Sequence, residues 1–81
     1  MNQILKGVFL KKTNFSSANL TWVNFNGSSL IETNFTNINL FEADFTGANI
    51  LNANFEGSNL NNAIWTDGKK CNLGSIGKCV K

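Results

Sequence analysis

The chain has 81 residues, a net charge of +2, and no proline, histidine or tyrosine. This length makes one small domain, and the lack of histidine removes the side chain that most often serves as a general base. No apolar run approaches the ~18 residues that a transmembrane helix needs, so we predict no transmembrane segment. The start lacks the long apolar core of a signal peptide. The sequence is therefore that of a cytosolic protein or of a mature chain whose signal was removed.

Residues 1–12 precede the regular part of the chain, and we interpret them as an N-terminal cap or an irregular first coil. Lys6, Lys11 and Lys12 lie in this segment, four more lysines follow the repeats, and the acidic residues lie between the two groups. Nucleic-acid binding requires basic residues clustered on one face rather than split between two ends. We therefore predict no nucleic-acid partner.

Residues 13–67 contain a large apolar residue at every fifth position. This period matches neither the 3.6-residue repeat of a helix nor the two-residue repeat of a strand. A small residue usually stands two positions before each large one, and Asn or Asp usually stands directly before it. The large residues, which we expect to form a stacked core, are Phe15, Leu20, Phe25, Leu30, Phe35, Leu40, Phe45, Ile50, Phe55, Leu60 and Trp65.

A five-residue unit cannot bury its own large side chain, so it must stack on copies of itself, as solenoid repeats do. Gly7, Gly27 and Gly47 each follow a large residue by two positions and lie twenty residues apart. Because glycine permits positive φ at tight turns, this spacing predicts a coil of four units with glycine at one corner. Two phenylalanine-rich columns would then oppose each other, and two aliphatic columns would form the remaining walls.

The same units resemble a known family. Ala18-Asn19-Leu20, Ala43-Asp44-Phe45, Ala48-Asn49-Ile50 and Ala53-Asn54-Phe55 are similar to the A-[D/N]-L/F-x-x unit of pentapeptide-repeat proteins. The resemblance covers roughly residues 13 to 67 and rests on consecutive units rather than on one motif. It implies an all-β fold: a right-handed quadrilateral parallel β-helix of about three coils with short capping segments.

The polar residues of the repeats predict structure rather than catalysis. Serine and threonine at the inward small positions suit hydrogen bonds to the backbone. Glu42 and Asp44 are close in sequence but should both be solvated at a corner. Asparagines recur at twenty-residue spacing, and we expect their amides to form hydrogen-bonded ladders between coils. We predict no enzyme activity, catalytic residue, metal site or cofactor.

Residues 68–81 break the period and contain Cys71 and Cys79. Two cysteines without histidine cannot complete a four-ligand zinc site, and their spacing is not that of a C-x-x-C redox motif. We predict a Cys71–Cys79 disulfide in a C-terminal cap that folds over Leu60 and Trp65; two reduced thiols are the alternative. A disulfide would indicate a periplasmic or secreted protein, and free thiols a cytoplasmic one. The pattern W-T-D-G-x-x-C…G-S-I-G-x-C also resembles the closing segment of some short bacterial pentapeptide-repeat proteins.

Four outward apolar residues form the candidate interaction surface. Trp22 and Phe41 lie on one predicted wall, and Ile31 and Leu51 lie on the opposite wall. Apolar pairs on one face of so small a protein are typical of a contact patch. The leading hypothesis is a non-enzymatic structural or protein-interaction module that self-associates, for example as a dimer, or binds a protein partner.

Two alternatives come from other functional classes. Some pentapeptide-repeat proteins mimic DNA and modulate type II topoisomerases, so the family resemblance implies this activity as an alternative. That mechanism needs a long acidic rod, whereas this chain is short and carries a net charge of +2. A third hypothesis is an enzyme or binding protein that uses the cysteine tail.

Overall fold

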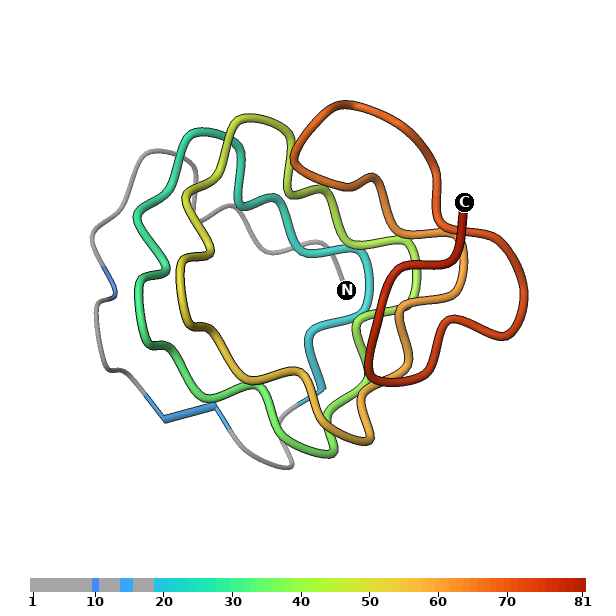
Figure 1. Cartoon of the computed structure of the whole chain (residues 1–81), viewed down its shortest axis with the longest axis horizontal. Helices are drawn as coiled ribbons and strands as arrows, with labels where there is room; N and C mark the ends of the chain where they lie inside the picture. The colour runs from blue at the N-terminus through green and yellow to red at the C-terminus, as the bar shows by residue number, and fades with distance from the viewer. Residues whose placement is uncertain (1–9, 11–13, 16–18) are drawn as a thin grey trace.

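The computed structural model describes residues 10, 14–15 and 19–81 (Figure 1). The boundary predicted between residues 12 and 13 lies outside the described residues, as does Thr13, one of the threonines expected at an inward small position. Within the described part of the chain there is no helix and no continuous strand, and β-pairing occurs at isolated bridges. No helix there is long and apolar enough to cross a membrane.

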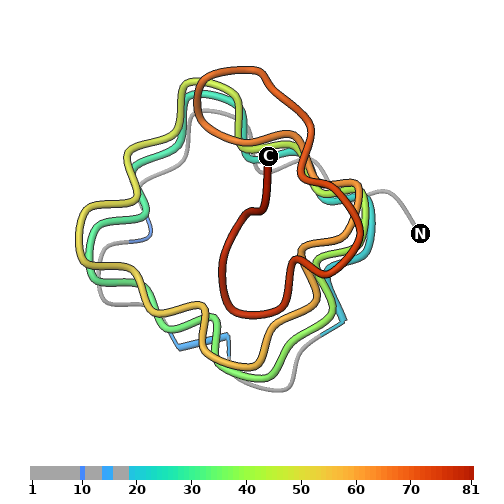
Figure 2. The ribbon, with the colours of Figure 1, turned by 45° about the vertical axis from the view of Figure 1, so that its right-hand side comes forward.

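The parallel bridges join residues that are twenty positions apart. The chain therefore returns to the same place after four five-residue units, and Figure 2 shows the resulting four-sided path with its coils stacked in register. Among the described residues, three of the four sides carry two successive parallel bridges each, and the fourth carries one. The bridged pairs are Asn14–Asn34–Asn54, Asn19–Asn39–Asn59, Asn24–Asp44–Ile64 and Ser29–Asn49.

Each corner between two sides is a β-turn. The amide three residues after most of the large apolar residues donates to the carbonyl of that residue, as from Val23 to Leu20 at 3.1 Å and from Ala43 to Leu40 at 3.0 Å. After Phe35 the Ile38 amide donates instead to Ser58 Oγ, at 3.2 Å. The residue two positions after the large one has positive φ, as the third residue of a type II turn requires. This holds for glycine and also for non-glycine residues, namely Trp22, Glu32, Asn37, Glu42, Asn52 and Asn62. The prediction of a glycine corner once per coil was therefore too narrow: every described corner from Trp22 to Asn62 has the left-handed conformation.

The asparagine side chains stabilise their own turns. The Oδ1 atom of Asn24 accepts the amide of Asn26 at 2.9 Å, and that of Asn49 accepts the amide of Leu51 at 3.1 Å. The same bond, from the amide two residues later, recurs at Asn19, Asn34, Asn39, Asp44, Asn54 and Asn59. The predicted amide ladder between coils is wrong for these residues, because the nearest unsatisfied donor is the turn amide in the same unit.

The core is a stack of aromatic rings. Phe35 lies parallel to Phe15 at 5.5 Å and to Phe55 at 4.9 Å between ring centroids. It also meets Phe25 and Phe45 edge-on from the opposite side at 5.7 and 6.0 Å. Offset-stacked and edge-on pairs are the favourable aromatic geometries, so one ring gains from both columns.

Most of the predicted stack is buried, and its ends are less so. Leu20, Phe25, Leu30, Phe35, Leu40, Phe45, Phe55 and Leu60 are buried, whereas Phe15, Ile50 and Trp65 are half-buried and pack against them. Val23 and Ile38 occupy positions where small residues prevail and are also buried. Inward hydroxyls bond to the backbone as predicted: Thr33 Oγ1 donates to the Leu10 carbonyl at 2.7 Å, and Ser58 Oγ donates to the Phe35 carbonyl.

Candidate functional site: the C-terminal end

The C-terminal segment reverses direction and pairs with the last coil. A turn closed by the Gly68 amide and the Trp65 carbonyl, at 2.9 Å, ends the regular repeat. The chain then runs antiparallel to the coil beneath it, with bridges Ile64–Lys70 and Asn59–Ile76. The parallel order therefore ends where the sequence loses its five-residue period.

This cap provides carbonyl acceptors for backbone amides of the last coil that would otherwise have no hydrogen-bond partner. The amides of Leu60, Asn62 and Trp65 donate to carbonyls of the cap at 2.7, 2.9 and 2.8 Å. In the lower coils the equivalent amides donate to the next coil, as Leu40 does to Asn59 at 2.9 Å. The cap thus takes the place of a fourth coil along the sides that contain Leu60 and Trp65, the two residues over which the sequence predicted a lid.

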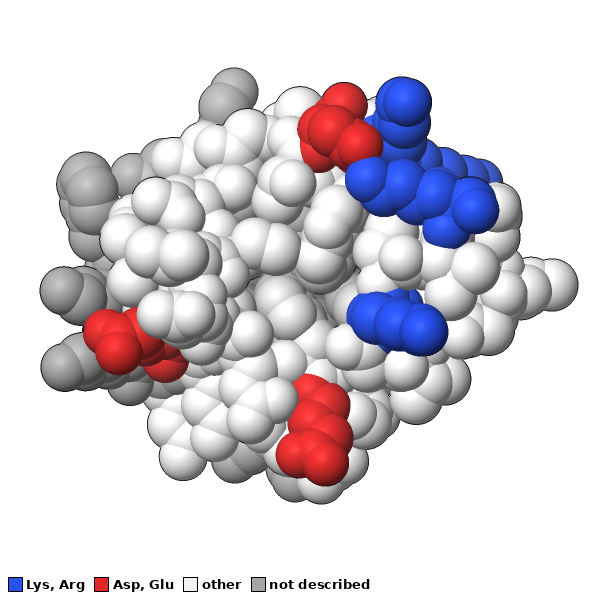
Figure 3. Space-filling view, in the orientation of Figure 1, with Lys and Arg blue, Asp and Glu red and all other residues white. Residues whose placement is uncertain are grey.

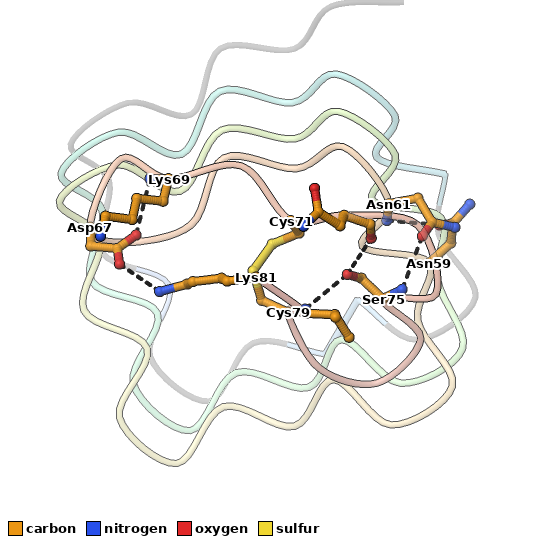
Figure 4. The surroundings of a disulfide bond; sticks show 10 residues. Asn59, Asn61, Asp67, Lys69, Cys71, Ser75, Cys79 and Lys81 are labelled. Carbon is orange, nitrogen blue, oxygen red and sulfur yellow. Dashed lines mark hydrogen bonds and ion pairs between the residues drawn. A yellow bond between two sulfur atoms is a disulfide. The ribbon is translucent and has the colours of Figure 1, made fainter.

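Ser75 holds the cap together. Its amide donates to Asn61 Oδ1 at 3.0 Å, its hydroxyl donates to the Asn72 carbonyl at 2.6 Å, and the same hydroxyl accepts the Val80 amide at 2.9 Å (Figure 4). Ser75 itself is fully buried, and its three bonds lie partly shielded from water. Ser75 was not predicted from the sequence, where its place between Gly74 and Gly77 in the cysteine loop was the available signal.

Cys71 and Cys79 are joined by a disulfide with their Cα atoms 5.0 Å apart. Cys71 is fully buried against the core, and Cys79 packs on the core from a half-buried position. Figure 4 shows the bond beside the Ser75 network, so the cross-link and the hydrogen bonds fasten the same loop.

An exposed ion pair closes the other side of the cap. Lys81 Nζ lies 2.5 Å from Asp67 Oδ2, and Asp67 Oδ1 accepts the Lys69 amide at 3.0 Å. The hydrogen bond from Lys81 is the main cause that holds the pKa of Asp67 below its ordinary value, and the bond from the Lys69 amide adds to it. Both side chains are solvent-exposed, so the ion pair adds little to the free energy of unfolding. Its main effect is to fix the position of the C-terminal residue.

The cap leaves part of the end without backbone hydrogen bonds. Among the described residues, no carbonyl accepts the amides of Ile50, Asn52, Phe55 and Gly57. One coil below, the equivalent amides donate upward, as from Leu30 to Asn49 at 2.7 Å and from Glu32 to Leu51 at 2.8 Å. We call the segment 50–57 the open edge; it lies at the left and lower left of Figure 2, and its last residue, Gly57, lies beneath Gly77 of the cap, where a Cβ added to Gly77 would come within 3.6 Å of the Gly57 nitrogen.

The structure distributes the candidate interaction residues over two corners. Trp22 is 48% exposed, and its amide donates to the Phe41 carbonyl at 2.8 Å, so the two stack on successive coils. Phe41 and Ile31 are half-buried. Leu51 is 61% exposed and belongs to the open edge, one coil above Ile31. The Ile31/Leu51 wall therefore continues into unpaired backbone, whereas the Trp22/Phe41 wall continues into the cap side.

Nothing in the described residues has the form of a chemical site. They contain no pocket and no group of three or more possible metal ligands. Glu42 is exposed, and Asp44 is half-buried with its Oδ1 bound to the amide of Thr46 at 3.0 Å. The exposed walls and ends of the solenoid are therefore the candidates for a functional surface.

A family model described as "Pentapeptide repeats (8 copies)" matches residues 2–30 and 24–62, which is most of the chain. The chain belongs to the pentapeptide-repeat family. The family and its solved structures imply a right-handed quadrilateral β-helix, in agreement with the twenty-residue register of the bridges. Pentapeptide-repeat proteins generally act as structural or interaction modules rather than as enzymes.

Two solved pentapeptide-repeat proteins resemble this one closely in fold. HetL from the cyanobacterium Nostoc sp. strain PCC 7120, a protein involved in heterocyst differentiation regulation, aligns with a TM-score of 0.82 and 25% identity over 86% of this chain and 33% of its own. A protein of the Arabidopsis thaliana thylakoid lumen aligns with a TM-score of 0.77 and 26% identity over 79% of this chain and 44% of its own. The chain thus spans less than half the length of either protein. No curated protein gives a significant match.

Proposed function

We propose that this pentapeptide-repeat protein is a non-enzymatic interaction module that self-associates through the open edge and the adjoining Ile31/Leu51 wall. The observation that carries the proposal is the set of four amides of the open edge without a backbone acceptor, two of which flank the exposed Leu51. An uncovered edge of a β-structure is a template for pairing with another chain. The repeated fold supports the same reading, since a right-handed β-helix of about three coils presents walls and ends rather than a cleft.

A second copy of this chain can supply the hydrogen-bond acceptors that the open edge lacks. The edge offers amides at Ile50, Asn52, Phe55 and Gly57, which in the lower coils all meet carbonyls of another pentapeptide unit. A backbone that repeats with the same five-residue spacing can present carbonyls at matching intervals, and a second copy of this chain is such a backbone. Leu51 would lose its exposed area in the contact, which adds an apolar contribution to the hydrogen bonds.

The contact should be weak. One largely exposed leucine and four amides must offset the loss of translational and rotational freedom on association. We expect a dissociation constant of roughly micromolar to millimolar, so the oligomeric state has to be followed over a wide concentration range. The regulatory role stated for HetL is of the kind that interaction modules perform, and it supports this class of function.

Sedimentation equilibrium tests the proposal with two matched variants. Leu51→Lys places a charge on the open edge, and Trp22→Lys places the same charge on the other exposed corner. We expect the wild type and Trp22→Lys to associate with the same constant and Leu51→Lys to remain monomeric. A wild type that stays monomeric up to about 1 mM would refute self-association. Loss of association in Trp22→Lys alone would assign the interface to the Trp22/Phe41 wall.

We also propose that the protein works in an oxidising compartment, either the periplasm or outside the cell. The proposal rests on the Cys71–Cys79 disulfide, because such bonds persist in oxidising compartments and are rare in the cytosol. Mass spectrometry after alkylation of the protein from its native cells measures the redox state. A cross-linked tail supports export, and two alkylated cysteines would place the protein in a reducing compartment.

A further inference from the structure

The cap loop carries the most exposed large apolar side chain among the described residues. Leu73 is 80% exposed and Ile76 is 53% exposed, while Ser75 between them is fully buried. The Ser75 bonds to Asn61 and Asn72 fix the loop from the inside. Its neighbours are therefore held outward, and the loop cannot fold Leu73 onto the core without breaking this buried network.

Four lysines surround this loop in the sequence. Lys69, Lys70, Lys78 and Lys81 are all exposed, and Asp67 is the one acidic residue between positions 67 and 81, so the segment carries four positive charges against one negative charge. Figure 3 shows lysine side chains gathered on one side of the visible face, with acidic groups mostly elsewhere. Among the described residues, positive charge is therefore concentrated at the cap.

We propose that the cap loop docks on the surface of an anionic lipid bilayer. Leu73 and Ile76 would enter the interface, while the lysines remain at the level of the headgroups. The inference goes beyond the proposed self-association and does not rest on it, since it uses a different part of the end of the solenoid.

The shape of the loop favours a bilayer over a protein surface. The described residues form no pocket beside the loop, and Leu73 projects from a convex turn. A fluid interface accommodates a projecting apolar side chain without a preformed socket, and anionic headgroups complement the lysines. Binding by two partly inserted side chains and a few lysines is weak and reversible, and it should fall as salt screens the charges.

Vesicle co-sedimentation of the oxidised full chain tests the proposal. The probes are vesicles of phosphatidylcholine alone and vesicles of equal parts phosphatidylcholine and phosphatidylglycerol, at low and high salt. We expect binding to the phosphatidylglycerol vesicles only, with loss at high salt. Lys69→Gln/Lys70→Gln should weaken binding about 25-fold, at roughly fivefold per lysine.

Leu73→Ser/Ile76→Ser provides the decisive variant. It keeps every charge and should reduce binding at least tenfold, because interfacial binding scales with the apolar area that enters the bilayer. Trp22→Ser is the control: it removes an exposed apolar side chain from the repeats, outside the open edge, and should leave vesicle binding unchanged. Near-UV circular dichroism checks that each variant keeps the fold.

Four outcomes would overturn the proposal. They are no binding to phosphatidylglycerol vesicles, equal binding to phosphatidylcholine vesicles, unchanged binding by Leu73→Ser/Ile76→Ser, and equal loss in Trp22→Ser. The third would show adsorption by charge alone. Capture of a poly-glutamate peptide without vesicle binding would assign the basic cap to an acidic protein partner instead.

Discussion

Removal of the Cys71–Cys79 disulfide should lower the melting temperature substantially while leaving the lower coils intact. The bond links residues eight positions apart, and loop-closure entropy for a loop of this size gives a stabilisation of about 2.5 kcal/mol at 25 °C. For a domain of this length, such a loss corresponds to a decrease of roughly 10–20 °C in melting temperature. The loss of about 2.5 kcal/mol is a large fraction of the total free energy of unfolding, which is only about 4–12 kcal/mol for a chain of this length.

The assay is thermal unfolding at fixed protein concentration, followed by near-UV circular dichroism, with and without a phosphine reductant. Cys71→Ser/Cys79→Ser, which cannot re-form the bond, should melt at or below the temperature of the reduced wild type and should not respond to the reductant. Since Cys71 is fully buried, the variant also places a hydroxyl in the core, and Cys71→Ala/Cys79→Ala separates that effect. A reduced wild type that melts within about 2 °C of the oxidised form would refute the role of the disulfide in holding the cap.

Three further predictions concern the repeats and the cap. Phe35→Ala, which removes the ring at the centre of both aromatic columns, should cost about 3–5 kcal/mol in urea unfolding, whereas a cost under 1 kcal/mol would show that the columns act independently. Gly57→Ala should destabilise more than Gly27→Ala, because both sites have positive φ but only a Cβ at Gly57 would meet another side chain; equal losses would mean that φ alone matters. NMR titration should find the pKa of Asp67 below its ordinary value and higher in Lys81→Met, so that the bond favours the cap at neutral pH and is lost as pH falls through the lowered pKa; an unchanged pKa in Lys81→Met would contradict the pairing.

The repeat could be read from the sequence because its period is set by one large side chain per unit. Every fifth residue, such as Phe35 or Leu40, must face the interior. The spacing of these residues in the sequence therefore reveals the path of the backbone. The conformation at the corners was harder to read. Glu32 and Trp22 have positive φ because stacking with neighbouring coils imposes the turn, and their side chains give no local signal of it.

The cap was predicted as a segment but not in its details. The two cysteines and the end of the period indicated a closing loop, yet the role of Ser75 depends on Asn61, which belongs to the repeats and lies fourteen positions earlier. The exposure of Leu73 follows from that same anchoring. Likewise, the extent of the open edge depends on how far the cap reaches across the end of the solenoid. The five-residue spacing of the repeats does not predict that path.

Amide hydrogen exchange as a function of protein concentration tests the proposed function most directly. The amides of Leu60 and Asn62 bind the cap and should be protected at every concentration, whereas those of Ile50, Asn52, Phe55 and Gly57 have no acceptor within the described chain. Self-association through the open edge predicts that these four amides exchange rapidly in dilute solution and become protected as concentration rises. Exchange that stays equally fast while the protein demonstrably associates would contradict the account.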